Sequence, residues 1–178
     1  MSSNLAVRIE PYEHLPPTYQ EDDPHTRELA AEIARLITAG APDMVVEHVG
    51  STSVAGLGGK GVVDLMLVYP PGRIDPAREH LDRLGFQPQR SRDPFPEDRP
   101  MRVGSVQWKG RRYRMHVHVL SAHSPEVDDL RTFRNRLRED RDLRERYARL
   151  KREILARGIG DSLDYWKAKS TFFEAGVT

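Results

Sequence analysis

The feature that most constrains the fold is an apolar segment at residues 62–68 with one acidic residue inside it. The segment is rich in β-branched residues and ends at Pro70-Pro71-Gly72, which predicts a buried strand. By the two-residue period of a strand, Asp64 shares a face with Val62 and Met66. An unpartnered carboxylate in a core would cost several kcal/mol. Asp64 therefore needs a partner: a metal ion, a basic side chain or backbone N–H groups.

A second predicted strand, at residues 112–120, carries two histidines and pairs with a strand at 103–108. Alternation places Arg114, His116 and His118 on one face and apolar residues on the other. If this strand lies beside the one with the acidic residue, two imidazoles and a carboxylate converge into a metal or acid–base cluster. The alternative is a polar face turned to solvent, which is common in antiparallel strands.

Small polar residues follow a predicted buried strand at residues 44–48. The sequence Gly50-Ser51-Thr52-Ser53 offers backbone N–H groups and hydroxyls, as anion-binding turns do, although a simple turn would use the same residues. The glycines at 56–61 match a dinucleotide fingerprint but precede a strand instead of opening a helix, so that motif is excluded. A phosphate-binding loop is excluded as well, because Val54 stands where its first glycine is required.

The remaining pattern predicts one α/β (α+β) domain over residues 1–178, with a mixed sheet flanked by helices and a helical C-terminal extension at about 125–174. The Pro-rich stretch at 90–100 indicates an exposed, mobile loop. The predicted helices cover 25–38, 75–84 with Asp75 as its cap, 125–138, a segment capped by Asp140, and a segment beginning near Asp161. The histidines expected on the surface are His14, His25, His80 and His123.

Composition excludes several classes of function. The 28 basic and 27 acidic residues give a net charge of +1, whereas coating nucleic acid or a membrane surface needs a positive field. The absence of cysteine excludes disulfides, thiol catalysis and iron–sulfur clusters, and we expect neither flavin nor haem. The N-terminal residues lack a signal pattern, and no apolar run approaches the ~18 residues of a membrane span. We therefore expect a cytoplasmic protein with no membrane partner.

Lysine is rare in this arginine-rich chain, with five residues in all. An ammonium group differs from a guanidinium in being a compact point charge. Lys60 follows the glycine-rich loop, and Lys151 and Lys169 lie near tyrosines in the predicted helices. Binding of phosphate or carboxylate is the functional interpretation, and a solvated helix face is the alternative.

Together these motifs resemble the GrpB family over about residues 5–174. The residues that carry the resemblance are Glu47 through Val54, Gly56-Leu57, Lys60, Asp64, His116 through Val119, Phe133 through Arg138, Tyr147, Leu150-Lys151, Tyr165 through Lys169, and Phe172.

The resemblance implies a nucleotidyltransferase-superfamily fold. In active members of that superfamily, a Gly-Ser turn cradles triphosphate, and three acids hold two magnesium ions. Gly50-Ser51 and Asp64 match that pattern, but Met66 stands where the second acid is expected. The strand that should carry the third acid has His116 and His118 instead. A standard two-magnesium site is therefore absent, and a single divalent ion (Mg, Mn or Zn) held by Asp64 with histidine help is one interpretation.

The leading hypothesis is metal-dependent transfer of a nucleotidyl group to a small-molecule or protein acceptor. Asp64, His116 and His118 would be catalytic residues and metal ligands. The residues expected to bind phosphate or substrate are Gly50, Ser51, Thr52, Ser53, Lys60, Arg134, Lys151, Tyr165 and Lys169. The alternative is a catalytically silent module that binds a nucleotide, CoA or a protein partner. Nucleic acid is not an expected partner, because acidic residues interrupt the basic face at 139–153.

Overall fold

The computed structural model describes residues 7–91, 93–158 and 172. The helix predicted near Asp161, together with Tyr165 and Lys169, lies outside the described residues. The elements, in chain order, are β1 (Ile9–Glu10), α1 (His25–Gly40), β2 (Val45–Val49), the 3₁₀ turn η1 (Ser51–Ser53), β3 (Val62–Tyr69), α2 (Ile74–Leu84), β4 (Gln87–Pro88), β5 (Met101–Trp108), β6 (Arg111–Ser121), α3 (Pro125–Glu139) and α4 (Arg141–Ala156).

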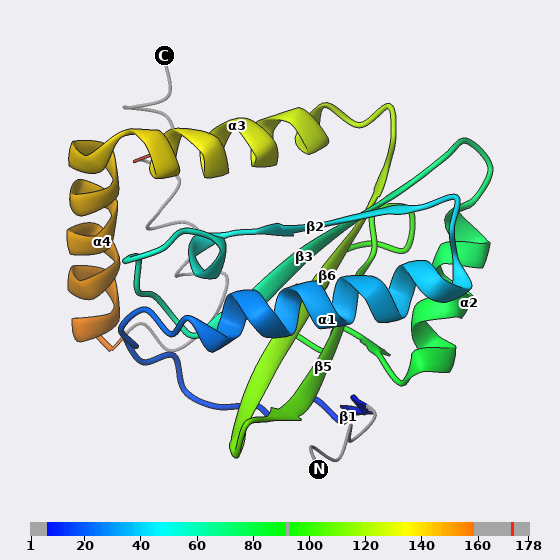
Figure 1. Ribbon diagram of the computed structural model, residues 1–178, viewed down its shortest axis with the longest axis horizontal. Helices are drawn as coiled ribbons and strands as arrows, with labels where there is room; N and C mark the ends of the chain where they lie inside the picture. Colours follow the sequence, from blue (N-terminus) through cyan, green and yellow to red (C-terminus); the bar gives the residue numbers. More distant parts are fainter. Residues whose placement is uncertain (1–6, 92, 159–171, 173–178) are drawn as a thin grey trace, which may run out of the picture.

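The strands form one mixed sheet in the order β1-β5-β6-β3-β2, with β4 paired to β5 (Figure 1). β3 and β6 run parallel, and the other pairs are antiparallel. β3 is nearly continuously apolar because it lies between β6 and β2 and is buried along almost all of its length, whereas β6 alternates polar and apolar residues. The predicted fold class, a mixed sheet flanked by helices, is confirmed.

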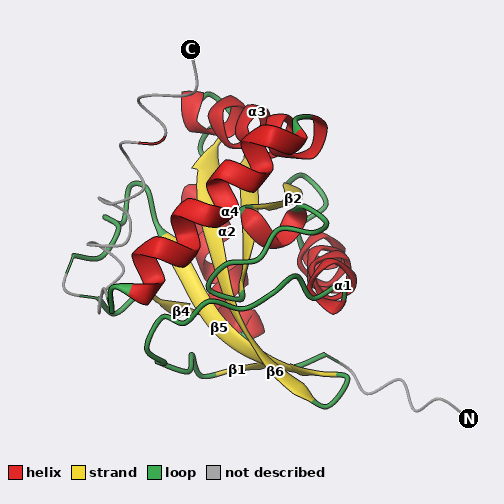
Figure 2. Cartoon of the chain, turned by 90° about the vertical axis from the view of Figure 1, so that its left-hand side faces the viewer, coloured by secondary structure: helices red, strands yellow, loops and turns green. Residues whose placement is uncertain are grey.

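One face of the sheet packs on α1 and α2 and forms the main core. Leu65 of β3 and Val117 of β6 contribute to it, together with Ile33 of α1 and Leu81 of α2, and all four side chains are fully buried. The opposite face carries a smaller apolar cluster, in which Met66 packs near α3. Figure 2 shows α1 on one side of the sheet and α3 above its upper end. The alternation predicted for β6 therefore separates a core face from a face that holds the histidines.

Three local predictions are wrong. The strand predicted as buried at 44–48 is the edge strand β2, and Val45 is 51% exposed because only one side of β2 is paired. His80 is buried, since it lies on the inner face of α2, where its Nε2 pairs with the Ile37 carbonyl oxygen at 2.8 Å. Asp75 lies in the first turn of α2, and the N-cap position belongs to Arg73.

Other helix boundaries follow their sequence signals. The Asp140 carboxylate accepts a hydrogen bond from the Leu143 amide at 2.9 Å and caps α4 as predicted. The described residues of the Pro-rich stretch before Arg99 are exposed. No helix in the described part of the chain combines the length and apolar character needed to cross a membrane.

Candidate functional site

The parallel pairing of β3 with β6 assembles the acidic residue and the two histidines. Asp64 pairs with His116, and Met66 pairs with His118. The Asp64 Oδ1 atom lies 3.4 Å from His116 Nδ1 and 3.6 Å from His118 Nε2. A quarter of the Asp64 side chain stays exposed. The cluster is therefore built from two central strands and remains open to a ligand.

Each imidazole has a second partner that sequence patterns did not indicate. The Tyr12 hydroxyl lies 3.0 Å from His116 Nε2, and an Arg99 guanidinium nitrogen lies 3.3 Å from His118 Nδ1. Arg99 is itself bound by the Glu126 carboxylate on α3. Tyr12 and Arg99 come from irregular segments, where no periodicity marks which side chains point inward.

Burial and charge act in opposite directions on the cluster. Burial raises the pKa of Asp64, but the interactions with His116 and His118 outweigh it and hold the pKa below its usual value. Burial also lowers the pKa of His116, against the opposing charge of Asp64. At neutral pH the cluster therefore consists of a carboxylate beside an uncharged His116 imidazole.

The Gly50-Ser51 turn lies against the other carboxylate oxygen. Gly50 has φ +70°, and a Cβ atom added there would lie 2.8 Å from Asp64 Oδ2. The Ser53 hydroxyl donates to the Gly50 carbonyl at 2.6 Å, and the Thr52 hydroxyl contacts His48 Nε2 at 2.9 Å. These two hydroxyls stabilise the turn internally. Among the described residues, the Ser51 hydroxyl has no such partner, so it is the one left to bind a ligand.

Replacing Gly50 with alanine should destabilise the fold more than the same change at Gly72. Both glycines have positive φ, +70° and +75°, so both variants suffer backbone strain, and Gly50, with ψ −174°, lies in a region that essentially only glycine adopts. Only at Gly50 does the new Cβ meet another group, the Asp64 carboxylate, whereas nothing lies within 4 Å at Gly72. Chemical denaturation of both variants measures the difference. Equal losses would show that the turn does not press on Asp64.

Lys151 reaches this turn from α4. Its ammonium group donates to the Gly58 carbonyl and lies 4.6 Å from the Tyr147 ring centroid, and the side chain is 1% exposed. The position that a Cβ of Gly59 would occupy lies 2.9 Å from Ser51 Oγ and 3.2 Å from Lys151 Nζ. The alternative interpretation of Lys151, that it lies on a solvated helix face, is therefore wrong. The missing side chain of Gly59 lets a buried cation and the Ser51 hydroxyl border the same space.

Two other predicted phosphate-binding residues, Lys60 and Arg134, lie in different surroundings. Lys60, just before β3, acts electrostatically on His116 and lowers its pKa. Arg134 of α3 is instead held by β2, where it donates to Glu47 Oε2 at 3.0 Å and to the His48 carbonyl at 3.1 Å. Glu47 is the cross-strand neighbour of Met66, and Arg131 binds it as well. Glu47 is thus neutralised and does not replace the acid missing at Met66.

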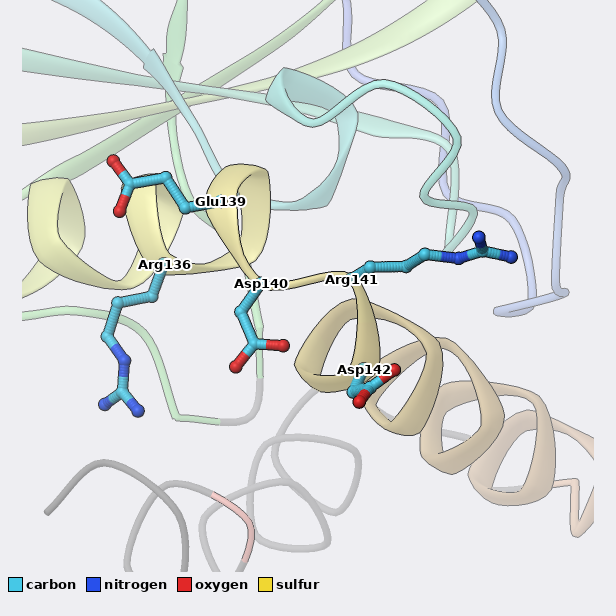
Figure 3. Close-up of a pocket in the computed structure, with 5 residues that line it drawn as sticks. All are labelled: Arg136, Glu139, Asp140, Arg141 and Asp142. Atoms are coloured by element: carbon cyan, nitrogen blue, oxygen red, sulfur yellow. The ribbon is translucent and has the colours of Figure 1, made fainter.

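In the part of the chain that the structure describes, no three His, Cys, Asp or Glu side chains are arranged as a metal-binding group. A cavity of about 510 Å³ lies elsewhere, where α3 meets α4 (Figure 3). Its lining residues are Arg136, Glu139, Asp140, Arg141 and Asp142. The charges in this cavity are mixed, and none of the predicted site residues lines it. The Asp64 cluster therefore remains the candidate site.

The fold and site together define an α/β protein with a mixed sheet, in which a Gly-Ser turn and an Asp-His-His cluster meet at the central strands. The chain belongs to the GrpB family: the family model described as GrpB protein matches residues 16–177. The expected family resemblance is thereby confirmed.

Curated relatives and solved structures agree with this membership. A UPF0157 protein of Streptomyces coelicolor is 35% identical over 136 residues, which cover 76% of this chain and 68% of the relative. A UPF0157 protein of Halalkalibacterium halodurans is 31% identical over 88% of this chain and 78% of the relative. The crystal structure of the conserved protein GrpB from Enterococcus faecalis is similar with a TM-score of 0.65 and 25% identity, covering 88% of this chain and 92% of that one.

A more distant likeness extends to the Cid1 poly(U) polymerase. Its crystal structure matches with a TM-score of 0.43 and 15% identity, over 70% of this chain and 39% of that one. At this distance the likeness carries no argument about what the present chain binds or does.

Proposed function

We propose that this protein binds a nucleotide or related phosphate ester at the Gly50-Ser51 turn and transfers its nucleotidyl group to an acceptor with the help of a divalent cation. The observation that carries the proposal is the position of Asp64. One of its carboxylate oxygens faces the two imidazoles, and the other lies against the turn. A phosphate held at the turn would therefore be adjacent to a carboxylate.

The groups around the turn favour an anion. The Ser51 hydroxyl can donate a hydrogen bond, and the buried Lys151 ammonium borders the same space beside Gly59. A buried cation near a hydroxyl interacts with phosphate more strongly than an exposed one does, because water screens it less. Lys60 adds positive charge on the His116 side.

A single magnesium or manganese ion fits the donor set. Magnesium in phosphate-transferring sites is held by one or two carboxylates plus the substrate's own phosphates, so three protein ligands are not needed. Asp64 would hold the ion, which would supply charge stabilisation to the transferring phosphate. His116 is uncharged at neutral pH, which is the state that a general base requires.

One observation favours a second candidate function, a catalytically silent module. Met66 stands where a second carboxylate would complete the metal site, and its neighbour Glu47 is bound by two arginines. A module of this kind would hold a nucleotide, a CoA-like ligand or a protein partner without turnover.

Thermal unfolding with a panel of ligands separates the two functions. The panel contains nucleoside triphosphates and CoA, each with and without magnesium, manganese or zinc. A ligand at 100 times its dissociation constant should stabilise the fold by about 2.7 kcal/mol. Stabilisation that needs both nucleotide and metal would support transfer, and stabilisation by nucleotide or CoA alone would support the silent module. No shift with any ligand would contradict nucleotidyl transfer and would leave only a silent module that binds a protein partner.

A further inference from the structure

The two imidazoles beside Asp64 are each held between two groups. His116 lies between the Tyr12 hydroxyl and Asp64, and His118 lies between Arg99 and Asp64. A neutral imidazole carries its proton on one nitrogen only, and the partners decide which one. The positions of these partners therefore determine the state of each ring.

Arg99 is compatible with only one protonation state of the neutral His118 ring. A guanidinium group can donate hydrogen bonds but cannot accept them, so the Nδ1 atom facing it must be the unprotonated nitrogen. The proton of His118 then lies on Nε2, the nitrogen that faces Asp64 Oδ1. This state is favourable for Asp64 as well, because a carboxylate only accepts.

Tyr12 completes the arrangement at His116. The Nδ1 atom faces the same carboxylate oxygen and is best protonated there, which leaves Nε2 to accept a hydrogen bond from the Tyr12 hydroxyl at 3.0 Å. Tyrosine can also accept, so this side of the cluster is adaptable. Arg99 is the partner that cannot adapt.

We propose that Tyr12 and Arg99 are positioning residues that hold both histidines as N–H donors toward Asp64, and that Arg99 thereby prevents His118 from ligating zinc. The site would therefore favour a cation that binds carboxylate and phosphate oxygens, such as magnesium, over zinc. The choice of cation rests on the proposed function, whereas the protonation of the two rings does not.

Distance alone would permit a zinc ion. Ligand atoms at about 2.0–2.1 Å from a tetrahedral metal are separated by about 3.3–3.4 Å, close to the 3.4 Å and 3.6 Å between Asp64 Oδ1 and the two ring nitrogens. Zinc would need a bare Nε2 on His118, and the proton would then move to Nδ1 and face the Arg99 donor. A proton, not the spacing, keeps zinc out.

Arg99 has little freedom to move away. The Glu126 carboxylate binds one edge of its guanidinium group, through Nη2 and through Nε, which lies 2.9 Å from Glu126 Oε2. Its guanidinium carbon lies 4.2 Å from the Phe95 ring centroid, and the Phe95 ring meets His118 edge-on. These contacts hold the donor against His118 Nδ1.

The first measurement is the protonation of the histidine rings in the unliganded protein. Long-range ¹H–¹⁵N correlation spectra at neutral pH should show His118 protonated on Nε2 and His116 protonated on Nδ1. A Tyr12→Phe variant should shift the His116 Nε2 signal and leave His118 unchanged. A proton on His118 Nδ1 would overturn the inference, and this result does not depend on any ligand or turnover.

The second measurement is calorimetric titration with zinc ions alone. Arg99→Met should bind zinc about 10- to 100-fold more tightly than the wild type, the usual size of effects from groups next to metal ligands. Arg35→Met, at an exposed ion pair on α1, is the matched control and should leave zinc affinity unchanged. The double variant with His118→Gln should lose the gain.

Equal zinc affinity in wild type and Arg99→Met would overturn the inference, as would a gain that survives loss of His118. A failure of the proposed function would give a different result. Nucleotide with magnesium would then not stabilise the protein, while the protonation of the two histidine rings would stay as described.

Discussion

Replacing Asp64 with asparagine should weaken metal-dependent nucleotide binding by about 100-fold or more, equivalent to about 2.7 kcal/mol. The variant keeps the shape of the side chain but removes the charge that a magnesium ion needs. It also exchanges a carboxylate for a weaker acceptor between two imidazoles. Calorimetric titration of a nucleoside triphosphate in the presence and absence of magnesium measures both effects.

Asp43→Asn is the matched control for this experiment. Asp43 lies in an exposed ion pair with Arg73, so its loss should leave nucleotide affinity unchanged. Magnesium-dependent affinity that survives in Asp64→Asn would show that the metal is held elsewhere and would remove Asp64 from the proposed site.

The second large effect is a loss of stability below neutral pH through His48. Burial, opposed by the charge of Asp64 and reinforced by nearby arginines, lowers the pKa of His48 from 6.5 to about 4. Between these values the unfolded chain binds a proton that the folded protein does not. The contribution of uncharged His48 to the free energy of unfolding is therefore fully present above pH 6.5. It is lost as the pH falls to about 4, and the total loss is about 3 kcal/mol.

Denaturation of the wild type and of His48→Gln across this pH range isolates the contribution. The variant should lose the part of the slope between pH 6.5 and 4 that His48 contributes, because glutamine does not titrate, whereas His116, whose pKa burial also lowers, keeps its own contribution. His123→Gln, at an exposed position, should behave as the wild type does. Parallel curves for wild type and His48→Gln would contradict the assignment.

The part of the site that could be predicted from the sequence lies on regular strands. Residue parity along β3 and β6 places Asp64, His116 and His118 on one face, and the register of the parallel pair then brings them together. A strand period of two is a strong signal, because one face must be apolar to form the core. The Gly50-Ser51 turn was predicted for a similar reason, since it ends a strand.

The rest of the site depends on contacts that a linear pattern does not encode. Tyr12 and Arg99 lie in irregular segments and reach the histidines through the tertiary fold. His80 and Lys151 are polar residues on helices, and periodicity alone did not show that a neighbouring carbonyl would satisfy each of them inside the protein. Arg134, which is predicted to bind phosphate, also forms an ion pair with Glu47 of β2 that no linear pattern indicated.

The parallel pairing of β3 with β6 also governs the order in which the protein can fold. β2 and β3 are neighbours in the chain, as are β5 and β6, so each pair can form as a local hairpin. The Asp64 cluster needs residues from both hairpins, and until they dock, the carboxylate lacks both of its imidazole partners. Joining the hairpins closes a longer loop than either hairpin does by itself and is therefore entropically more demanding. A probe on His116 should therefore report a later step of folding than a probe on β2 does.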